Sequence, residues 1–232
     1  MSCFGFLSPK KTYKLTYFPV TALGEPIRMT FALAGIPFEN EPVPGKNWPE
    51  LKAKLPEGSQ MPILNVKEGD KTSLMFQSRA ILRYIGSIGK YKGYKIYPDD
   101  PMERYLCDMV IEMVEDVRPK IAPTFSIQDQ AEKEAARLSL VRPGGGMYNG
   151  LVKLNEQLGK YPFAAGDKPT IADAYVVTIC FMLQAPSFLD GFPPDTYKDM
   201  PNIVALKDRF CALPPIKEYY KDAEGIRAPF KV

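Results

Sequence analysis

The sequence predicts two domains of different structural class, an α/β domain followed by an all-helical domain. Strand and helix signals alternate in the first third of the chain, whereas every periodic segment after Pro98 has a helical spacing of about 3.6 residues. The chain has 232 residues, of which 45% are hydrophobic and 25% are charged, as in an ordinary globular protein. Two small domains fit this length, and we place them at residues 11–90 and 98–232.

The first domain is expected to join a βαβ unit to a ββα unit around a mixed sheet. Aromatic and β-branched residues predict a strand at 13–18. A helix then opens at Gly24-Glu25-Pro26 and ends at the Gly35 cap, because proline suits the first turn and glycine suits the end of a helix. A second strand is expected around 38–43, before an irregular stretch.

The rest of the first domain is predicted to be a hairpin followed by a helix. The two strands are expected at 62–66 and 72–76, with the turn at Gly69-Asp70. The helix begins at Ser78 and ends near Gly86, and its apolar residues lie on one side. The hairpin and this helix complete the ββα unit.

The stretch SQMPILNV places a proline at the mouth of an apparently buried strand. Proline cannot donate to a sheet ladder, so it belongs at the first residue of a strand or on an edge. Pro62 therefore either only marks the start of the strand, or follows a cis peptide bond that turns the chain and leaves a backbone position unpaired.

The second domain is predicted to be helical throughout, and a glycine run at 144–146 separates two of its helices. Thr170 and Asp173 form a T-x-x-D cap before a long apolar run. The helix that they open is expected to be buried, and both residues are expected to be structural. A linker rich in Gly, Lys and Tyr precedes the domain at about 88–100. The other helices are expected at 101–121, 129–141, 147–159, 202–213 and 215–222.

Composition and charge disfavour several classes of function. The net charge is +3 and no basic run is longer than Lys10-Lys11, which disfavours nucleic acid as a partner. No apolar run approaches the roughly 18 residues of a membrane span. The four cysteines are scattered and the N-terminus does not resemble a secretory signal, so we expect a reduced, cytoplasmic protein. The first residues form a short tail or, alternatively, a shortened transit peptide.

The absence of histidine limits the available chemistry further. It excludes a Ser-His-Asp triad, a Cys-His pair and any zinc site that needs histidine. Catalysis must therefore use tyrosine, carboxylate, lysine or cysteine side chains, or a borrowed cofactor.

Three motifs follow one another in a distinctive order: P-I-L from Pro62, Q-S-x-A-I-x-R-Y from Gln77 and T-I-A-D-A from Thr170. Together with the strand at 13–18, they resemble the cytosolic glutathione transferases over about residues 11–220. The similarity is greatest to the tyrosine-dependent classes, above all the sigma class, which includes the glutathione-requiring prostaglandin D synthases. The resemblance implies an N-terminal thioredoxin-like domain followed by a C-terminal helical-bundle domain.

The function that this resemblance implies is transfer of the glutathione thiolate to electrophilic, apolar small molecules, a detoxification reaction. Glutathione would be the co-substrate, no metal would be required, and the enzyme would be a cytoplasmic homodimer. A glutathione-dependent isomerase of the prostaglandin D synthase type is one alternative. A non-catalytic ligand-binding protein on the same fold is another, because Leu23 stands where sigma-class enzymes carry an arginine, six residues after the catalytic tyrosine.

The same resemblance assigns catalysis to Tyr17, at the end of the first strand in L-T-Y-F. A phenol O–H donated to the glutathione sulfur would stabilise the thiolate, which is the nucleophilic form of a thiol. Tyr13 is predicted to point to the same face of the strand and is the competing candidate.

Several residues match the family's glutathione contacts. The residue before the cis proline of the family offers its backbone to the cysteinyl part of glutathione, which implies a cis bond between Met61 and Pro62. Gln77 and Ser78 correspond to the residues that hold the γ-glutamyl carboxylate, although Ser78 would also suit a plain helix N-cap. The W-x-x-x-K pair of Trp48 and Lys52 matches residues that contact the glycine end. A core tryptophan and a solvated lysine are the alternatives for this pair.

Asp116 matches the acid that, in the family, reaches across the dimer to the glutathione amine. With Glu112 and Glu115 it has i, i+3, i+4 spacing, so three carboxylates share one helix face and a cation is expected nearby. That face could also be a solvated surface or a metal-touched dimer seam. The expected glutathione contacts are Phe18, Trp48, Lys52, Met61, Pro62, Gln77, Ser78 and Asp116.

Overall fold

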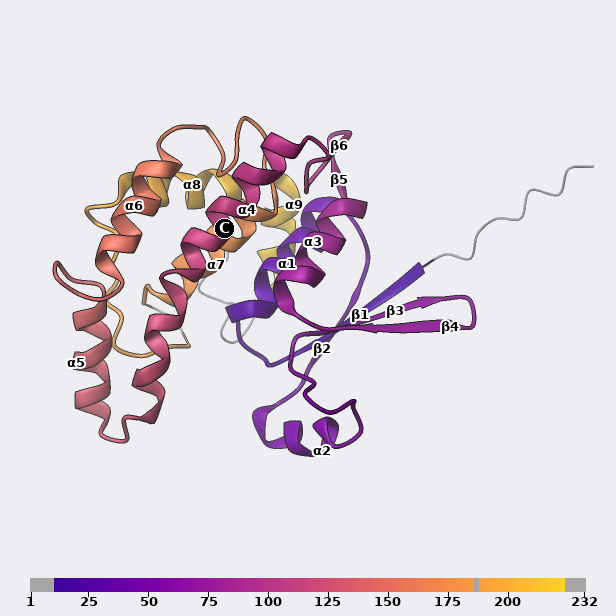
Figure 1. Ribbon diagram of the computed structural model, residues 1–232, viewed down its shortest axis with the longest axis horizontal. Helices are drawn as coiled ribbons and strands as arrows, with labels where there is room; N and C mark the ends of the chain where they lie inside the picture. The colour runs from indigo at the N-terminus through magenta and orange to yellow at the C-terminus, as the bar shows by residue number, and fades with distance from the viewer. Residues whose placement is uncertain (1–10, 186–187, 224–232) are drawn as a thin grey trace, which may run out of the picture.

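The computed structural model describes residues 11–185 and 188–223. Figure 1 shows a sheet with its flanking helices on one side of the molecule and the helices of the second half of the chain on the other. The predicted fold class, an α/β domain followed by a helical domain, is confirmed.

The α/β domain is built on a four-stranded mixed sheet. Its strands are β1 (Lys11–Tyr17), β2 (Glu39–Pro42), β3 (Ile63–Glu68) and β4 (Lys71–Met75). They lie in the order β2-β1-β3-β4, with β2 parallel to β1, and with β3 antiparallel to both β1 and β4. Leu15 of β1 lies opposite Leu64 of β3, and both side chains are completely buried. The core of this domain therefore lies on the central pair of strands.

Three helices flank this sheet. α1 (Glu25–Ala34) and α3 (Ser78–Ile88) pack against each other on one face, and the short α2 (Trp48–Lys52) lies on the opposite side (Figure 1). α1 ends at Gly35 as predicted, and the φ of 62° at this residue is a left-handed conformation that glycine adopts without strain. Short 3-10 turns precede α1 and α2, at Ala22–Gly24 and Gly45–Asn47.

The second domain surrounds one buried helix, α7 (Ile171–Met182). All 12 of its residues are buried, and it contacts α1 as well as the helices of its own domain, so it joins the two halves of the molecule. None of the helices in the described part of the chain combines the length and the apolarity that crossing a membrane requires. The other helical segments are α4 (Pro101–Glu115), a 3-10 segment (Arg118–Ser126), α5 (Gln130–Leu140), α6 (Tyr148–Leu158), α8 (Pro201–Cys211) and α9 (Pro214–Tyr220).

The start of α7 is fixed by the capping box that the sequence predicts. The Thr170 hydroxyl accepts the Ala172 N–H at 3.3 Å, and the Asp173 carboxylate accepts the Thr170 N–H at 2.7 Å. Asp173 is completely buried and also accepts the Ala164 N–H at 2.8 Å. Its carboxylate therefore ties a neighbouring loop to the first turn of the central helix.

The helix expected at 101–121 is shorter in the structure, because α4 ends at Glu115. A 3-10 segment that contains Pro119 and Pro123 follows it. Proline lacks a backbone N–H and disfavours the α conformation in the residue before it, so a regular α-helix cannot continue through Arg118. Arg118 consequently lies outside α4, at the start of the 3-10 segment.

The segment expected as a linker contains a small hairpin. Its strands are β5 (Lys90–Tyr91) and β6 (Tyr94–Lys95), which pair antiparallel. Lys92 and Gly93 join them with φ values of 48° and 90°. Positive φ at both central residues is typical of the two-residue turn that matches the twist of a hairpin.

Candidate active site

Tyr17, the predicted catalytic residue, is the last residue of β1 and is buried, with 5% of its surface exposed. The Leu23 backbone N–H donates to its phenolic oxygen at 3.2 Å. Burial raises the pKa of Tyr17 above its ordinary value, although the Leu23 N–H and the charges of Arg28 and Arg118 act in the opposite direction. The phenol therefore keeps its proton at neutral pH and is able to donate it in a hydrogen bond.

Gly24 leaves room for the ring of Tyr17. A Cβ atom at this position would lie 2.4 Å from Cδ1 and 2.7 Å from Cγ of Tyr17, closer than atoms of folded proteins approach. The close packing of backbone on ring holds the tyrosine against the turn that donates the Leu23 N–H. A side chain at position 24 would therefore displace the hydroxyl from its donor.

A buried arginine holds the loop between β1 and α1. Arg28 is 2% exposed and forms an ion pair with Glu25 at 2.7 Å. It also donates to the backbone oxygens of Val20, at 3.0 Å, and Phe18, at 3.3 Å. Its guanidinium carbon lies 5.6 Å from the centroid of the Tyr17 ring. The ion pair and hydrogen bonds of Arg28 thus hold the loop after Tyr17 in place.

Tyr13, the competing candidate, has a different environment. It is only partly buried, and its ring packs against Phe31 at a centroid distance of 5.5 Å. Burial and the neighbouring Tyr84 raise the pKa of Tyr13 to about 12. It lines a separate depression with Lys11 and Lys67, whereas Tyr17 lies against the turn at Leu23.

A cleft of about 410 Å³ lies beside Leu23. Met61, Gln77 and Ser78, all predicted as glutathione contacts, line one of its walls. The Met61–Pro62 bond is cis, so the sequence-based prediction of its geometry is confirmed. Pro62 itself is buried and immediately precedes β3, whereas Met61 is partly exposed. The structure therefore brings these predicted residues to one cleft.

The start of α3 opens into the same cleft. Ser78 is the first helical residue, and Gln77 occupies the N-cap position without a side-chain cap bond, so the alternative reading of Ser78 as a plain N-cap is wrong. Gln77 has a φ of 72°, a strained value for a residue with a side chain. The first-turn N–H groups of a helix have no partners within it, and this end of α3 is therefore suited to an anion.

A row of aromatic rings leads from Tyr17 to α2. The Phe18 ring lies 5.6 Å from that of Tyr17 and 6.3 Å from that of Trp48, in edge-to-face geometry. Trp48 is partly exposed, so it is not a core residue, and Lys52 is exposed one turn later on α2. These residues lie outside the lining of the 410 Å³ cleft and extend the site along the edge of the α/β domain.

Family models match both domains of the chain. A model described as "Glutathione S-transferase, N-terminal domain" covers residues 13–87, and one described as "Glutathione S-transferase, C-terminal domain" covers residues 115–223. A glutathione S-transferase of Anopheles gambiae is 34% identical over 188 residues, which are 78% of this chain and 85% of the relative. The chain belongs to the glutathione S-transferase family.

Other relatives of this transferase carry a more specific name. The hematopoietic prostaglandin D synthase of Gallus gallus is 31% identical over 204 residues, covering 88% of this chain and 92% of the relative. A solved structure titled as a prostaglandin synthase D of Nilaparvata lugens has a TM-score of 0.75 and 29% identity, and it covers 92% of this chain and 99% of that chain. The predicted transferase family and fold are thus confirmed. The sigma-like class, the domain boundaries and the roles of single residues stay predictions.

The acidic face predicted on α4 is present in the transferase and meets cations. Glu112 forms ion pairs with Arg79 at 2.7 Å and with Arg83 at 3.5 Å, both from α3. Glu115 is paired with Arg118 at 2.6 Å. The expectation of a nearby cation is confirmed for these two glutamates. Asp116 is exposed at the end of α4, and no ion pair of its side chain occurs among the described residues.

Two residues of the helical domain that sequence analysis did not assign to the site line the cleft. Glu115 and Arg118 face Leu23, Met61 and Ser78 across it. No local pattern marks Arg118, because it lies in the proline-containing segment after α4. A cleft-facing cation can be recognised there only once the two domains are packed together.

The cysteines of the described residues are poor nucleophiles. Cys107, Cys180 and Cys211 are buried, and burial raises the pKa of each thiol to about 12. Less than one part in a thousand of such a thiol is ionised at neutral pH. None of these three cysteines is therefore suited to supply a reactive thiolate at neutral pH.

Proposed function

We propose that glutathione binds in the cleft and that Tyr17 donates its phenolic hydrogen to the sulfur, which then attacks an apolar electrophile. The observation that carries this proposal is that the buried Tyr17 hydroxyl accepts the N–H of Leu23, a residue that lines the cleft, although Tyr17 itself is not part of the lining. This N–H occupies one lone pair of the oxygen. Among the described residues, no side chain or backbone group accepts the Tyr17 proton, so the proton is available to a ligand.

Stabilisation of the thiolate is the step that needs the protein. A free thiol has a pKa of about 8.5, so only a few per cent is ionised at neutral pH. A preorganised donor that contributes about 3 kcal/mol would lower this pKa by about two units. The bound thiol would then be mostly ionised at neutral pH and would attack the electrophile without a further base.

The peptide part of glutathione would extend over the two walls of the site. The backbone of Met61 would pair with the cysteinyl residue in the manner of an added strand. Gln77, Ser78 and the open N-terminus of α3 would hold the γ-glutamyl carboxylate. The Phe18–Trp48 pair and Lys52 would contact the glycine end. These roles require the three segments to act on one tripeptide.

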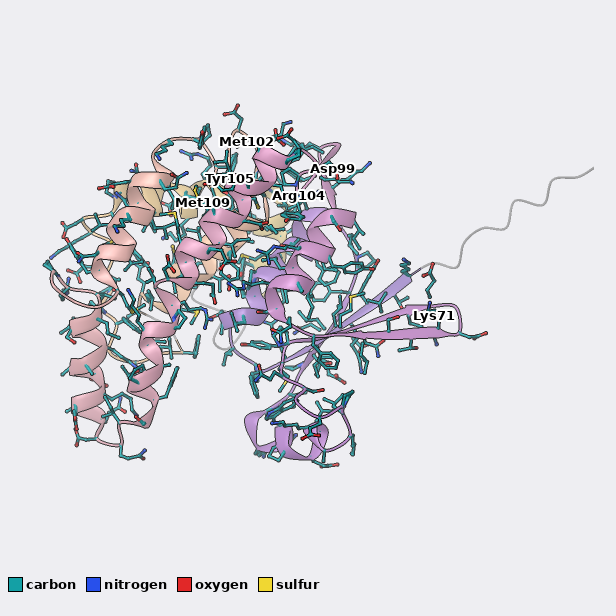
Figure 2. All side chains as sticks on the ribbon, in the orientation of Figure 1. Lys71, Asp99, Met102, Arg104, Tyr105 and Met109 are labelled. Carbon is teal, nitrogen blue, oxygen red and sulfur yellow. The ribbon has the colours of Figure 1, made fainter. Side chains whose placement is uncertain are left out.

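We also infer a two-fold homodimer in the cytoplasm. α4 exposes 64% of Met102 and 58% of Tyr105, and Met109 lies one turn farther along. Figure 2 shows these three side chains in a row along the outer side of α4. Burial of this stripe against a second copy would bring the exposed Asp116 towards the other subunit, where it would meet the ammonium group of glutathione. The domain boundaries at 11–90 and 98–232 are consistent with the same assignment.

A glutathione-dependent isomerase is the second candidate. The observation that favours it is the similarity to two proteins named as prostaglandin D synthases. Both reactions need the same thiolate, so Tyr17 would serve each of them. A non-catalytic binding protein would hold glutathione without activating it.

Replacement of Tyr17 by Phe tests the proposal. We expect glutathione binding, measured by calorimetry, to stay within threefold of the parent protein. Turnover of a generic aromatic electrophile should fall about a hundredfold, because one donor to the sulfur is lost, which commonly costs about 3 kcal/mol. The matched control is Tyr13→Phe, which removes a hydroxyl from the same strand and should leave turnover unchanged.

Three outcomes separate the candidates. Loss of turnover in Tyr13→Phe instead of Tyr17→Phe would show that the wrong tyrosine was chosen. Glutathione binding by the parent protein without conjugation, but with isomerisation of a prostaglandin endoperoxide, would select the isomerase. Binding without either reaction would select the ligand-binding protein.

A further inference from the structure

A positive charge enters the cleft from the helical domain. Arg118 lies at the start of the 3-10 segment after α4 and lines the cleft that Leu23, Met61 and Ser78 line from the other domain. Leu23 contributes a backbone N–H to Tyr17, but its side chain is apolar. The loop after Tyr17 therefore brings no cation of its own to this edge of the cleft.

The Arg118 guanidinium is held in a fixed orientation. Its Nε donates to Glu115 Oε1 at 2.6 Å and its Nη2 donates to Glu115 Oε2 at 2.7 Å, which is a two-point contact. Tyr175 of the buried helix α7 donates to the same carboxylate at 2.7 Å. Although burial raises the pKa of Glu115, these bonds hold it below its ordinary value, so the carboxylate stays charged. Arg118 is thus preorganised, with its side chain 24% exposed.

The turn at Leu23 relates Arg118 to Tyr17, because Leu23 lines the cleft together with Arg118 and its N–H donates to the Tyr17 hydroxyl oxygen at 3.2 Å. Burial raises the pKa of Tyr17, and the charges of Arg28 and Arg118 both oppose this rise. The other charged residues around the cleft are Glu57, Arg79 and Glu115. Arg79 approaches Glu115 to 3.8 Å, so this carboxylate is divided between two guanidinium groups. The negative charge of Glu115 therefore does not fully cancel that of Arg118 at the edge of the cleft.

Arg28 cannot present its charge to a ligand in the cleft, because its side-chain nitrogens are all engaged by groups within the protein. They bond to Glu25, Asn40 and backbone oxygens of the loop, and the side chain is 2% exposed. Arg118 is the arginine near Tyr17 that also lines the cleft. A ligand sulfur that accepts the Tyr17 hydrogen would consequently lie between the phenol and Arg118.

We propose that Arg118 stabilises the glutathione thiolate from the helical domain, and that Glu115 and Tyr175 position its guanidinium. The proposal rests on the proposed role of Tyr17. When the thiol ionises, its proton leaves to solvent and the sulfur keeps the electron pair, so the new negative charge meets the Tyr17 O–H on one side and Arg118 on the other. The site would then be assembled from both domains, and the second domain would contribute to activation of the thiol.

The decisive measurement is the pKa of the thiol in the complex with glutathione, read from the ultraviolet absorbance of the thiolate as pH is varied. Arg118→Gln removes the charge and keeps a donor for Glu115. We expect it to raise this pKa by about one unit, which is a tenfold smaller thiolate fraction below the pKa. Arg83→Gln is the matched control, because Arg83 also joins α3 to the carboxylates of α4 but is not part of the cleft lining. It should leave the thiol pKa within about 0.3 unit of the parent value.

A rescue experiment tests where the charge has to be. Leu23→Arg in the Arg118→Gln background places a guanidinium on the opposite wall, and it should restore at least half of the lost pKa shift. Tyr175→Phe should raise the thiol pKa by a smaller amount, because Arg118 keeps its charge but Glu115 loses a donor. These directions would not follow if Arg118 only supported the fold.

Other results would overturn the proposal. A weaker affinity for glutathione in Arg118→Gln with an unchanged thiol pKa would mean that Arg118 binds a carboxylate of the peptide instead. If Arg118→Gln fails to fold, Arg118→Lys decides, because lysine cannot repeat the two-point contact and should raise the pKa by part of a unit. An unchanged pKa in that variant also overturns the proposal. Failure of the proposed function itself looks different, since the parent complex would then show no lowered thiol pKa at all.

Discussion

Arg28 and Arg118 both oppose the rise that burial causes in the pKa of Tyr17, and they differ in what they contact. Arg28 is 2% exposed and bonds to Glu25, Asn40 and two backbone oxygens of the loop after β1. Arg118 is 24% exposed, bonds to Glu115 and lines the cleft. Arg28 thus uses its charge to stabilise the fold, whereas the charge of Arg118 is accessible to a ligand.

Two aspartates repeat this contrast. Asp173 is completely buried and accepts two backbone N–H groups and the Thr170 hydroxyl. Asp116 is exposed at the end of α4, and the described residues give its side chain no ion pair. Buried charged groups with several bonds should affect stability when removed, whereas the more exposed Arg118 and Asp116 should act on a bound ligand.

The largest effect is expected from Arg28→Met. This change removes the ion pair between Arg28 and the Glu25 carboxylate, which is 0% exposed. Breaking one partner of a buried pair costs about 3–5 kcal/mol of unfolding free energy. Urea denaturation measures it, with Arg118→Gln as the control that should lose about 1 kcal/mol or less. Equal losses of unfolding free energy in the two variants would show that Arg28 and Arg118 contribute equally to the fold.

The next effect is expected from Asp173→Ala, which should lower the unfolding free energy by about 3 kcal/mol because buried donors lose their acceptor. Any folded fraction should keep its activity. Burial raises the pKa of Asp173 to about 6, from an ordinary value of 3.8. The folded protein therefore binds the proton more tightly than the unfolded chain, and this contribution to stability is present below pH 3.8 and lost as pH rises through 6.

Denaturation at several pH values checks this sign. The stability difference between the parent protein and Asp173→Ala should be larger at about pH 4 than at about pH 7. If Asp173→Ala is stable but inactive, Asp173 has a role in catalysis and not in the fold. If the stability difference between the parent protein and the variant grows with pH, the buried carboxyl favours its charged form.

The smallest effect is expected from Asp116→Asn. It should leave unfolding unchanged and weaken glutathione binding by about 1–3 kcal/mol, the range for a charge-assisted hydrogen bond. A glutathione titration of the variant measures this loss, and sedimentation of the parent protein reports its oligomeric state. A parent protein that turns over as a monomer at micromolar concentration would show that Asp116 is only a surface charge.

Local sequence signals were sufficient where the structure depends on neighbouring residues. The cap of α7 at Thr170 and the end of α1 at Gly35 were predicted from short local patterns, whereas the cis bond before Pro62 was predicted through the family resemblance of the P-I-L motif. The cleft residues Gln77 and Ser78 were found through a motif of the same kind. The α/β wall of the site was therefore accessible from the sequence.

The wall that the helical domain contributes could not be predicted from the sequence, for physical reasons. Periodic apolar residues suggested that the helix of α4 continued to residue 121, but Pro119 ends the regular hydrogen bonding before it. Arg118 faces the cleft only because this break coincides with the packing of one domain on the other. The hairpin at Lys92-Gly93 was missed although its turn has a local signal, a glycine between two tyrosine-bearing strands.

The bond between Tyr220 and Glu25 has a consequence for the synthesis of the chain. The Tyr220 hydroxyl of α9 donates to the Glu25 carboxylate at 2.5 Å, across 195 positions of the sequence. Domains generally fold in the order in which they leave the ribosome, so the segment that carries Tyr17 emerges early. The Tyr220 donor emerges 195 positions after Glu25. The sheet of the α/β domain can therefore form before Tyr220 is synthesised, and the loop after Tyr17 gains the Tyr220–Glu25 bond beside it only once α9 has emerged.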